Sequence, residues 1–262
     1  MSDPISPGHG LVFAGGCPRS GLSVLRRLLT ADRRIHCGSD TGIAASIAMQ
    51  WDAFASQLAG LHEESFDLPP EAVRANMAGL IDDLLGAPLK HYPDARVVEK
   101  TPQNLITFER LATLLPGARF LHVVRDGRDV VHSLLERDWR DRDNRPLAYV
   151  TRPEAAMEYW SQMVEKGLEV EERIGRRRIL RVRYEALVRQ PADMLGRIQR
   201  FLALEPRRIT RFNHAVEWSG LERDSLPALN GPISLKHLRR GRALDPLMGE
   251  RQKSLMKALR AR

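Results

Sequence analysis

The feature of this sequence that most constrains its fold is a short apolar run that leads through a glycine-rich turn into a helical pattern. The run Leu11 to Ala14 is followed by GGCPRSG at residues 15–21, and helical periodicity then continues to about Thr30. A short apolar run between glycines is typical of a buried strand. Because a strand, a tight turn and a helix in this order begin an α/β unit, the chain is expected to contain a parallel sheet.

The rest of the chain repeats this alternation. Further strands are predicted at Arg96 to Val98, Arg119 to Val124 and Ile179 to Tyr184. Helices are predicted over residues 42–61 and 70–85, after Pro102, and over residues 128–137, 153–172 and 191–201. We therefore expect a three-layer α/β/α fold, whose central parallel sheet has about four or five strands and binds ligands at their carboxyl ends.

The length of 262 residues suits a single domain over residues 1–262. We expect residues 1–9 to form a flexible N-terminus and residues 205–262 to be less regular than the rest. No internal repeat or low-complexity stretch argues for another architecture.

Composition and charge restrict the classes of ligand and partner that this chain can bind. The formal net charge of +8 favours an anionic ligand, whereas an aromatic content of only 6% leaves little for stacking nucleic-acid bases. No apolar run is long enough for a bilayer, and the N-terminal segment lacks the features of a secretory signal. Cys17 and Cys37 are the two cysteines, without zinc-type spacing. We predict a cytoplasmic protein with no nucleic-acid, membrane or metal partner.

The first loop predicts a phosphate cradle. Gly16 and Gly21 have the spacing of the P-loop glycines, but Leu22 stands where ATP and GTP hydrolases need a lysine. Arg19 offers a bidentate donor inside the loop instead. Two alternatives stay open at this point: a turn that only packs the sheet, and an ATP site that lacks the usual lysine.

The same loop resembles a known family. GGCPRSGLSVLRRLL is similar to the 5′-phosphosulfate loop of sulfotransferases that use 3′-phosphoadenosine 5′-phosphosulfate (PAPS), and above all to the P-R-S-G-T-T loop of the tyrosylprotein branch. Leu22 and Ser23 replace the two threonines. The resemblance implies a P-loop-like sulfotransferase fold, PAPS as donor and 3′,5′-diphosphoadenosine (PAP) as product. It also implies that these residues bind the donor: Gly16, Pro18, Arg19, Ser20, Gly21, Leu22 and Ser23.

A second motif follows the strongest strand. In VRDGRDVVHS, residues 124–133, an arginine at the strand end and a hydroxyl on the next helix can converge on one phosphate. Alternatively, Arg125 pairs with Asp126 or Asp129. This stretch resembles the 3′-phosphate motif of the family, which implies that Arg125 and Ser133 bind the 3′-phosphate.

Three more segments carry the resemblance. VEKTP is similar to a strand end whose lysine, here Lys100, lies near the leaving-group oxygen in the family. RYEAL is similar to a strand end whose tyrosine, here Tyr184, lies near the 3′-phosphate. The family also places a basic residue of the C-terminal segment on the phosphates, and Lys236, Arg239 and Arg240 are the candidates. The alternative for Lys100 is a solvated lysine or a partner of Glu99, and the alternative for Tyr184 is a core tyrosine.

Transfer to a hydroxyl needs a proton acceptor. HCGSDT, residues 36–41, is similar to the C-G-E-E-T stretch of the tyrosylprotein branch, and ungapped alignment from Arg19 places Asp40 at the base. Asp40 could instead cap the next helix. His36 and His132 are other candidate bases, whereas His122, inside a predicted strand, is expected to be structural. The expected catalytic residues are Asp40, Lys100 and Arg19.

The sequence thus predicts a sulfotransferase that moves a sulfuryl group from PAPS to a hydroxyl of a small-molecule, carbohydrate or peptide acceptor. The transfer is expected to be direct and in line, without a metal. The alternatives are an ATP-dependent phosphotransferase of P-loop-like fold and a nucleotide-binding protein without catalysis. Gly42 replaces an arginine that faces the substrate peptide in the tyrosylprotein branch, so the acceptor stays open, as does a homodimer.

Overall fold

A parallel five-stranded sheet forms the centre of the computed structural model, which describes residues 6–212 and 230–261. The strands are β1 (Leu11–Gly15), β2 (Ile35–Cys37), β3 (Arg96–Lys100), β4 (Arg119–Val124) and β5 (Ile179–Arg183). Their order in the sheet is β2-β3-β1-β4-β5. From β1 the chain passes to the edge strand β2, returns to β3 beside β1, and then crosses to the other side of β1 with β4 and β5. Ligands of open α/β sheets bind at such a switch point.

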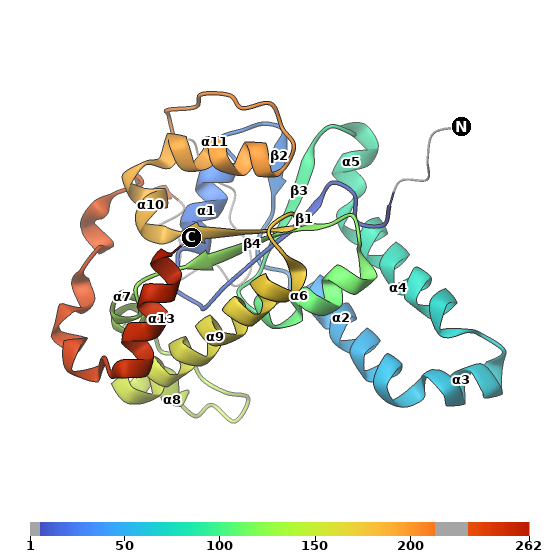
Figure 1. Cartoon of the computed structure of the whole chain (residues 1–262), viewed down its shortest axis with the longest axis horizontal. Coiled ribbons are helices and arrows are strands. Elements are labelled where there is room, and N and C mark those ends of the chain that lie inside the picture. Colours follow the sequence, from blue (N-terminus) through green and yellow to red (C-terminus); the bar gives the residue numbers. More distant parts are fainter. Residues whose placement is uncertain (1–5, 213–229, 262) are drawn as a thin grey trace.

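The strands are buried because helices cover both faces of the sheet (Figure 1). Alternate residues of one strand face opposite sides: Leu11 and Phe13 of β1 belong to one apolar cluster, and Val12 and Ala14 to the other. The cluster around Val12 packs against α1 (Leu22–Leu29), α10 (Tyr184–Arg189) and α11 (Pro191–Phe201). The other packs against α2 (Ile43–Ala53), α4 (Pro70–Leu85), α6 (Asn104–Leu114), α7 (Gly127–Leu134), α9 (Pro153–Ile174) and α13 (Glu250–Arg260).

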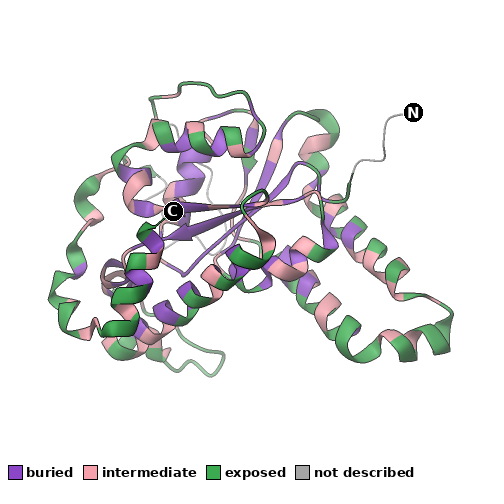
Figure 2. Cartoon of the chain, viewed as in Figure 1, coloured by how far each residue is buried: buried purple, intermediate pink, exposed green. Residues whose placement is uncertain are grey.

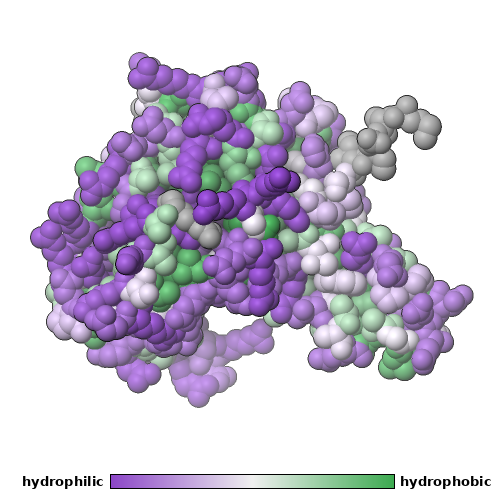
Figure 3. Space-filling view, viewed as in Figure 1, coloured by the Kyte–Doolittle hydropathy of each residue, from purple (hydrophilic) through white to green (hydrophobic). Residues whose placement is uncertain are grey.

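Helices α2 to α4 extend from the sheet as an arm at the lower right of Figure 1. A π-helical turn, η1 (Phe54–Leu58), joins α2 to α3 (Ala59–Phe66). The tip is exposed in Figure 2, and α3 buries none of its residues. Apolar side chains lie on this surface, as Figure 3 shows over the arm, and Phe66 is 72% exposed. The arm thus contributes less to the core than the layered part does.

Short elements complete the described chain. Helix α5 (Ala87–His91) precedes β3, and α8 (Ala148–Thr151) precedes α9. Two 3₁₀ segments, η3 (Leu235–His237) and η4 (Arg240–Leu247), lead to α13. Part of the predicted N-terminal segment makes contacts, since the Gly8 N–H donates to both carboxylate oxygens of Asp82 at 3.1 and 3.2 Å. Residues 1–5 and 213–229, within the segments predicted to be flexible or less regular, lie outside the described residues.

The predicted fold class is confirmed, although several elements differ from those predicted. Strand β2, which has only three residues, was not predicted, nor were the short helices α5, α8 and α10. The helix after Gly42 was predicted to end at Leu61, whereas helical structure continues through η1 and α3 to Phe66. No helix was predicted near the C-terminus, where α13 buries Leu255, Met256 and Leu259. That helix is rich in polar residues, so its apolar stripe is narrow.

Candidate active site

The first loop follows β1 and lies between the carboxyl ends of β3 and β4, because those strands flank β1. The Gly16 N–H donates to the Pro102 carbonyl at 3.2 Å, and a Cβ at Gly16 would lie 2.2 Å from the Val123 carbonyl oxygen. Gly21 has a φ of 108°, and its Cβ would lie 2.3 Å from the ring of Tyr184. Only glycine therefore fits at either position.

The remaining loop residues differ in what they can offer a ligand. Ser20 is buried, and Arg19 has a φ of 71°. Leu22 begins α1 and packs in the apolar cluster, so its backbone N–H is its polar donor at this end of the helix. Pro18 is buried, and Ser23 is partly buried on the first turn of α1. The geometry is that of a backbone cradle at a helix start, where anions bind.

Arg125 connects this loop to the C-terminal segment. Its guanidinium donates to the carbonyls of Arg19 at 3.1 Å and His237 at 2.6 Å, and it lies 4.2 Å from the ring centroid of Tyr184. Asp129 is 3.9 Å away, whereas Asp126 pairs with Arg128. Burial raises the pKa of Tyr184, although Arg125 opposes the shift. Arg125 and Tyr184, both predicted to bind the 3′-phosphate, therefore lie together beside Arg19 of the first loop.

Ser133 lies on the same side as Arg125, two turns into α7. Its Oγ accepts a hydrogen bond from Nε of Arg19 at 3.0 Å. Nε of Arg125 is buried and has no hydrogen-bond partner among the described residues. Two arginines and a hydroxyl from three segments therefore converge where the sequence predicted a phosphate.

Lys100 and Asp40 form an ion pair at the carboxyl end of β3. They are 60 residues apart in the sequence, and Lys100 is only 1% exposed. Lys100 pairs in register with Ala14, so it lies beside the end of β1. The capping alternative for Asp40 finds no support, because Gly42 is the N-cap residue of α2 and the Ile43 N–H at the helix start donates to Oγ1 of Thr41. Asp40 instead faces the lysine of the same predicted site.

The other candidate bases lie in different surroundings. His122 is buried and its Nδ1 is 2.7 Å from Oε1 of Glu171, which agrees with a structural role. His36 is exposed on β2. His132 lies 3.7 Å from Glu136 on the surface of α7.

The three C-terminal basic candidates also differ. The backbone N–H of Arg239 donates to Asp129 at 2.9 Å, which brings this segment onto α7. Arg240 forms an ion pair with Glu136 at 3.1 Å. Lys236 is exposed within η3. Burial lowers the pKa of the adjacent His237, and Lys236 lowers it further.

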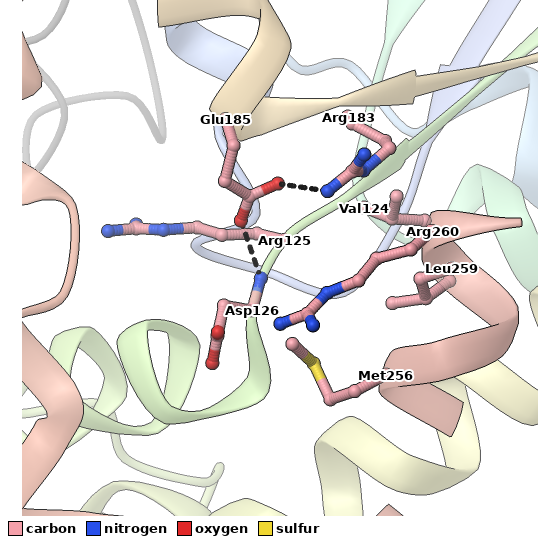
Figure 4. A pocket seen from close by; sticks show the side chains of 8 residues that line it. All are labelled: Val124, Arg125, Asp126, Arg183, Glu185, Met256, Leu259 and Arg260. Carbon is pink, nitrogen blue, oxygen red and sulfur yellow. Dashed lines mark hydrogen bonds and ion pairs between the residues drawn. The ribbon is translucent and has the colours of Figure 1, made fainter. Parts of the chain in front are cut away.

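A separate cavity lies at the ends of β4 and β5. Its volume is about 50 Å³, and Arg183, Glu185 and Arg260 are among the residues that line it (Figure 4). Glu185 accepts from the Asp126 N–H at 2.9 Å and lies 4.0 Å from Arg183. The side chain of Arg125 points away from Arg183 and Arg260 in this view. Arg125 also lines this cavity, but its guanidinium donates to the carbonyls of Arg19 and His237.

Sequence reasoning missed a buried carboxylate, Glu99, beside Lys100. Its oxygens accept hydrogen bonds from Thr41, Gly42, Thr101 and Asn104. The sequence did contain a signal for Glu99, an acidic residue within an apolar strand. Such a residue is rarely buried unless it has hydrogen-bond or charged partners. Its partners at residues 41 and 42 are 57 or 58 residues away, so spacing along the chain did not reveal them.

Within the described residues, no group of three or more His, Cys, Asp or Glu side chains could hold a metal ion. Both cysteines are buried, and burial raises the pKa of the Cys17 thiol. No helix of this part of the chain has the length and apolar character that a membrane crossing requires.

Comparison with known proteins decides the family. The sulfotransferase family model matches residues 12–207, a span that includes the first loop, the β4 motif and Tyr184. The chain belongs to the sulfotransferase family. The resemblance found in the sequence is thereby confirmed.

Two curated sulfotransferases illustrate the relationship. The protein-tyrosine sulfotransferase of Drosophila melanogaster is 28% identical over 202 residues, which are 73% of this chain and 38% of the relative. Protein-tyrosine sulfotransferase 2 of Gallus gallus is 28% identical over 242 residues, which are 88% of this chain and 58% of the relative. The matched regions thus span between 38% and 58% of the length of these relatives.

Solved sulfotransferase structures share the fold. The sulfotransferase domain from the curacin biosynthetic pathway aligns with a TM-score of 0.61 at 16% identity, covering 96% of this chain and 97% of that one. The sulfotransferase domain from the Synechococcus PCC 7002 olefin synthase aligns with a TM-score of 0.55 at 19% identity, covering 99% and 90%. At such identities the similarity shows the fold, which is the P-loop-like sulfotransferase fold.

Proposed function

We propose that this sulfotransferase uses PAPS as donor and transfers the sulfuryl group to a hydroxyl of a small-molecule, carbohydrate or peptide acceptor. The observation that carries the proposal is the Asp40–Lys100 ion pair beside the glycine-rich loop, at the carboxyl ends of adjacent strands. The names of the curated relatives make a tyrosine hydroxyl the first acceptor to test. The cytoplasmic location stays a prediction from the sequence.

The residues present fit a ligand with two separated anionic groups. Only glycine fits at positions 16 and 21, and the backbone N–H groups of this loop, at the start of α1, suit one of the two groups. Arg125 and Ser133 supply donors for the other, and the buried Nε of Arg125 is a donor that the described residues do not satisfy. PAPS carries a 5′-phosphosulfate and a 3′-phosphate, and when bound it supplies the sulfuryl group.

Asp40 and Lys100 then have complementary roles. The Asp40 carboxylate accepts the proton of the acceptor hydroxyl as the oxygen attacks. The Lys100 ammonium stabilises negative charge on the leaving oxygen, and Arg19 stabilises charge in the transferred group. The new oxygen–sulfur bond forms as the bond to the 5′-phosphate breaks, and no covalent enzyme intermediate is needed.

The donor site is tested by the melting temperature with two nucleotides that differ in the 3′-phosphate. PAP should raise the melting temperature without Mg²⁺, and AMP should raise it far less. Arg125→Ala should remove most of this difference, because a charge-assisted hydrogen bond contributes about 1.5 to 3 kcal/mol. Arg173→Ala, which removes ion pairs with Glu109 and Glu169 at an exposed arginine, is the matched control. Equal shifts from PAP and AMP would refute the 3′-phosphate assignment.

The reaction is tested with labelled PAPS against tyrosine peptides, sugars and small phenols or alcohols. Transfer of label to one of these acceptors in the presence of EDTA is the expected result. Phosphate transfer from ATP that requires Mg²⁺ would instead establish the phosphotransferase. Binding of PAP without transfer to any acceptor of the panel would favour the non-catalytic nucleotide-binding protein.

A further inference from the structure

The loop that carries Asp40 has little regular structure of its own. Residues 38–42 connect β2 to α2, and the structure assigns them to no helix or strand. Gly42, at its end, has a φ of 65°, and its carbonyl accepts the first helical hydrogen bond of α2 from Ser46 at 3.0 Å. A displacement of about 1 Å of a catalytic group can cost a hundredfold in rate. Something outside the loop must therefore fix Asp40.

Glu99 fixes the C-terminal end of this loop. It is 4% exposed, and its Oε1 accepts hydrogen bonds from Oγ1 of Thr41 at 3.0 Å and from the Gly42 N–H at 3.3 Å. Oε1 also accepts from Oγ1 of Thr101 at 2.6 Å, and Oε2 accepts from the Asn104 amide. Each of these donors is neutral. One buried carboxylate thus joins the loop to β3 and to the start of α6.

Lys100 contacts the loop from the next position of β3. Consecutive residues of a strand point to opposite faces, so the side chains of Glu99 and Lys100 leave β3 in opposite directions. Lys100 binds Asp40, and Glu99 binds the two residues that follow Asp40. The loop therefore lies across the end of β3, between the two side chains.

Arg26 fixes the N-terminal end of the loop. It lies on α1, is 4% exposed, and donates from Nε to the Cys37 carbonyl at 3.0 Å and from Nη1 to Oγ of Ser39 at 3.4 Å. Helix α1 begins directly after the glycine-rich loop. Arg26 therefore connects the loop of the candidate base to the helix of the donor site.

We propose that Glu99 and Arg26 are positioning residues, which hold residues 38–42 so that Asp40 stays beside Lys100. This inference rests on the proposed function, in which Asp40 is the base. Glu99 acts through hydrogen bonds to neutral donors of the loop, and Arg26 acts from the opposite end. Neither residue touches the acceptor in this role.

The test is a double-mutant cycle on turnover. Glu99→Gln should lower kcat about tenfold and leave the KM for PAPS within twofold, since a positioning defect affects the chemical step. In the Asp40→Asn background the same change should have less than a twofold effect, because Glu99 acts through Asp40. In a Ser133→Ala background, which alters the donor site, the tenfold effect should persist. Glu63→Gln on the exposed tip of α3 is the control and should leave kcat unchanged.

A second measurement separates this inference from the proposed function. Hydrogen exchange of peptides covering residues 38–42 should be about tenfold faster in Glu99→Gln, with β4 unchanged, whether or not transfer is detected. Arg26→Lys keeps the charge but loses the planar donor pair, and should give the same pattern if Glu99→Gln does not fold. Unchanged exchange in the loop, or a tenfold effect of Glu99→Gln that persists with Asp40→Asn, overturns the positioning role.

Discussion

Two buried carboxylates, Glu99 and Glu171, have different roles in two regions of this molecule. Glu99 is 4% exposed and Glu171 is 2% exposed. Glu171, on α9, contacts Nδ1 of His122 at 2.7 Å and receives two hydrogen bonds from Arg181 at 2.6 and 2.8 Å. Arg181 also donates to the Ala258 carbonyl of α13. This network therefore joins β4, β5 and two helices of the core.

The partners explain the difference between the two sites. The partners of Glu171 include a guanidinium and an imidazole on regular elements, and they hold its pKa at about 2 despite the opposing effect of burial. Glu99 instead binds neutral hydroxyl, amide and backbone donors, two of them in the loop that carries Asp40. We expect substitutions at Glu171 to lower stability and substitutions at Glu99 to lower turnover.

The largest expected effect is that of Glu171→Gln. Removing one partner of a buried ion pair costs about 3 to 5 kcal/mol, because the other charge stays buried without compensation. Urea unfolding should show this loss, while the folded variant keeps near-normal turnover. Glu165→Gln, which removes only an exposed ion pair with Arg251, is the matched control and should cost about 1 kcal/mol or less. A stable Glu171→Gln variant with low turnover would remove the contrast with Glu99.

The pH dependence of stability provides the next effect. Folding lowers the pKa of the Glu171 carboxyl from 4.5 to about 2, so its stabilisation is fully present above pH 4.5 and is lost as the pH falls toward 2. A shift of this size corresponds to about 3 kcal/mol. The unfolding free energy of the wild type should therefore fall more steeply below pH 4.5 than that of Glu171→Gln. Parallel pH profiles of the two proteins would contradict the assignment.

Asp40→Asn tests the catalytic role of the region that contains Glu99. If Asp40 is the base, turnover should fall about a hundredfold or more, equivalent to about 2.7 kcal/mol, while PAP affinity stays nearly unchanged. Asp138→Asn in the exposed loop after α7 is the control, because it changes the same side chain outside the site. Near-normal turnover of Asp40→Asn would move the search for the base to His36 or His132.

The residues of these two regions also show which features of the fold and the site could be predicted from the sequence. The strand Arg119 to Val124 and the segment Pro18 to Gly21 were predictable, because apolar runs and glycine-rich turns act through neighbours in the chain. Asp40 and Lys100 were each named, but their contact was not predicted, because 60 residues separate them. Tertiary contacts of this kind depend on the strand order, which local patterns do not determine.

The elements that were missed had weak local signals. Strand β2 has only three residues, so its alternation of buried Ile35, exposed His36 and buried Cys37 is too short to indicate a strand. Glu99 was read only as a possible partner of Lys100, whereas its hydrogen bonds run to Thr41, Gly42, Thr101 and Asn104. An acidic residue inside an apolar strand signals that buried partners exist, but the local sequence does not identify them.

The smallest expected effect concerns Gly42, which joins the loop of Asp40 to α2. Gly42 has a φ of 65°, a conformation that costs an alanine about 1 kcal/mol, although an added Cβ would meet nothing closer than Thr101 Cγ2 at 4.0 Å. The cost of Gly42→Ala is therefore conformational rather than steric. Gly38→Ala is the matched control in the same loop, because Gly38 has no positive φ and an added Cβ would find open space.

The outcome of Gly42→Ala depends on how firmly Glu99 holds the loop. If the hydrogen bonds of Glu99 to Thr41 and Gly42 fix the backbone, alanine is forced into the strained conformation. The variant should then lose about 1 kcal/mol of unfolding free energy, with turnover within about twofold of the wild type. If the loop instead relaxes, stability is retained and turnover falls, because Asp40 moves away from Lys100. Measuring both quantities on Gly42→Ala and Gly38→Ala decides between a rigid loop and a compliant one, and the second result would mean that Glu99 binds the loop without positioning it.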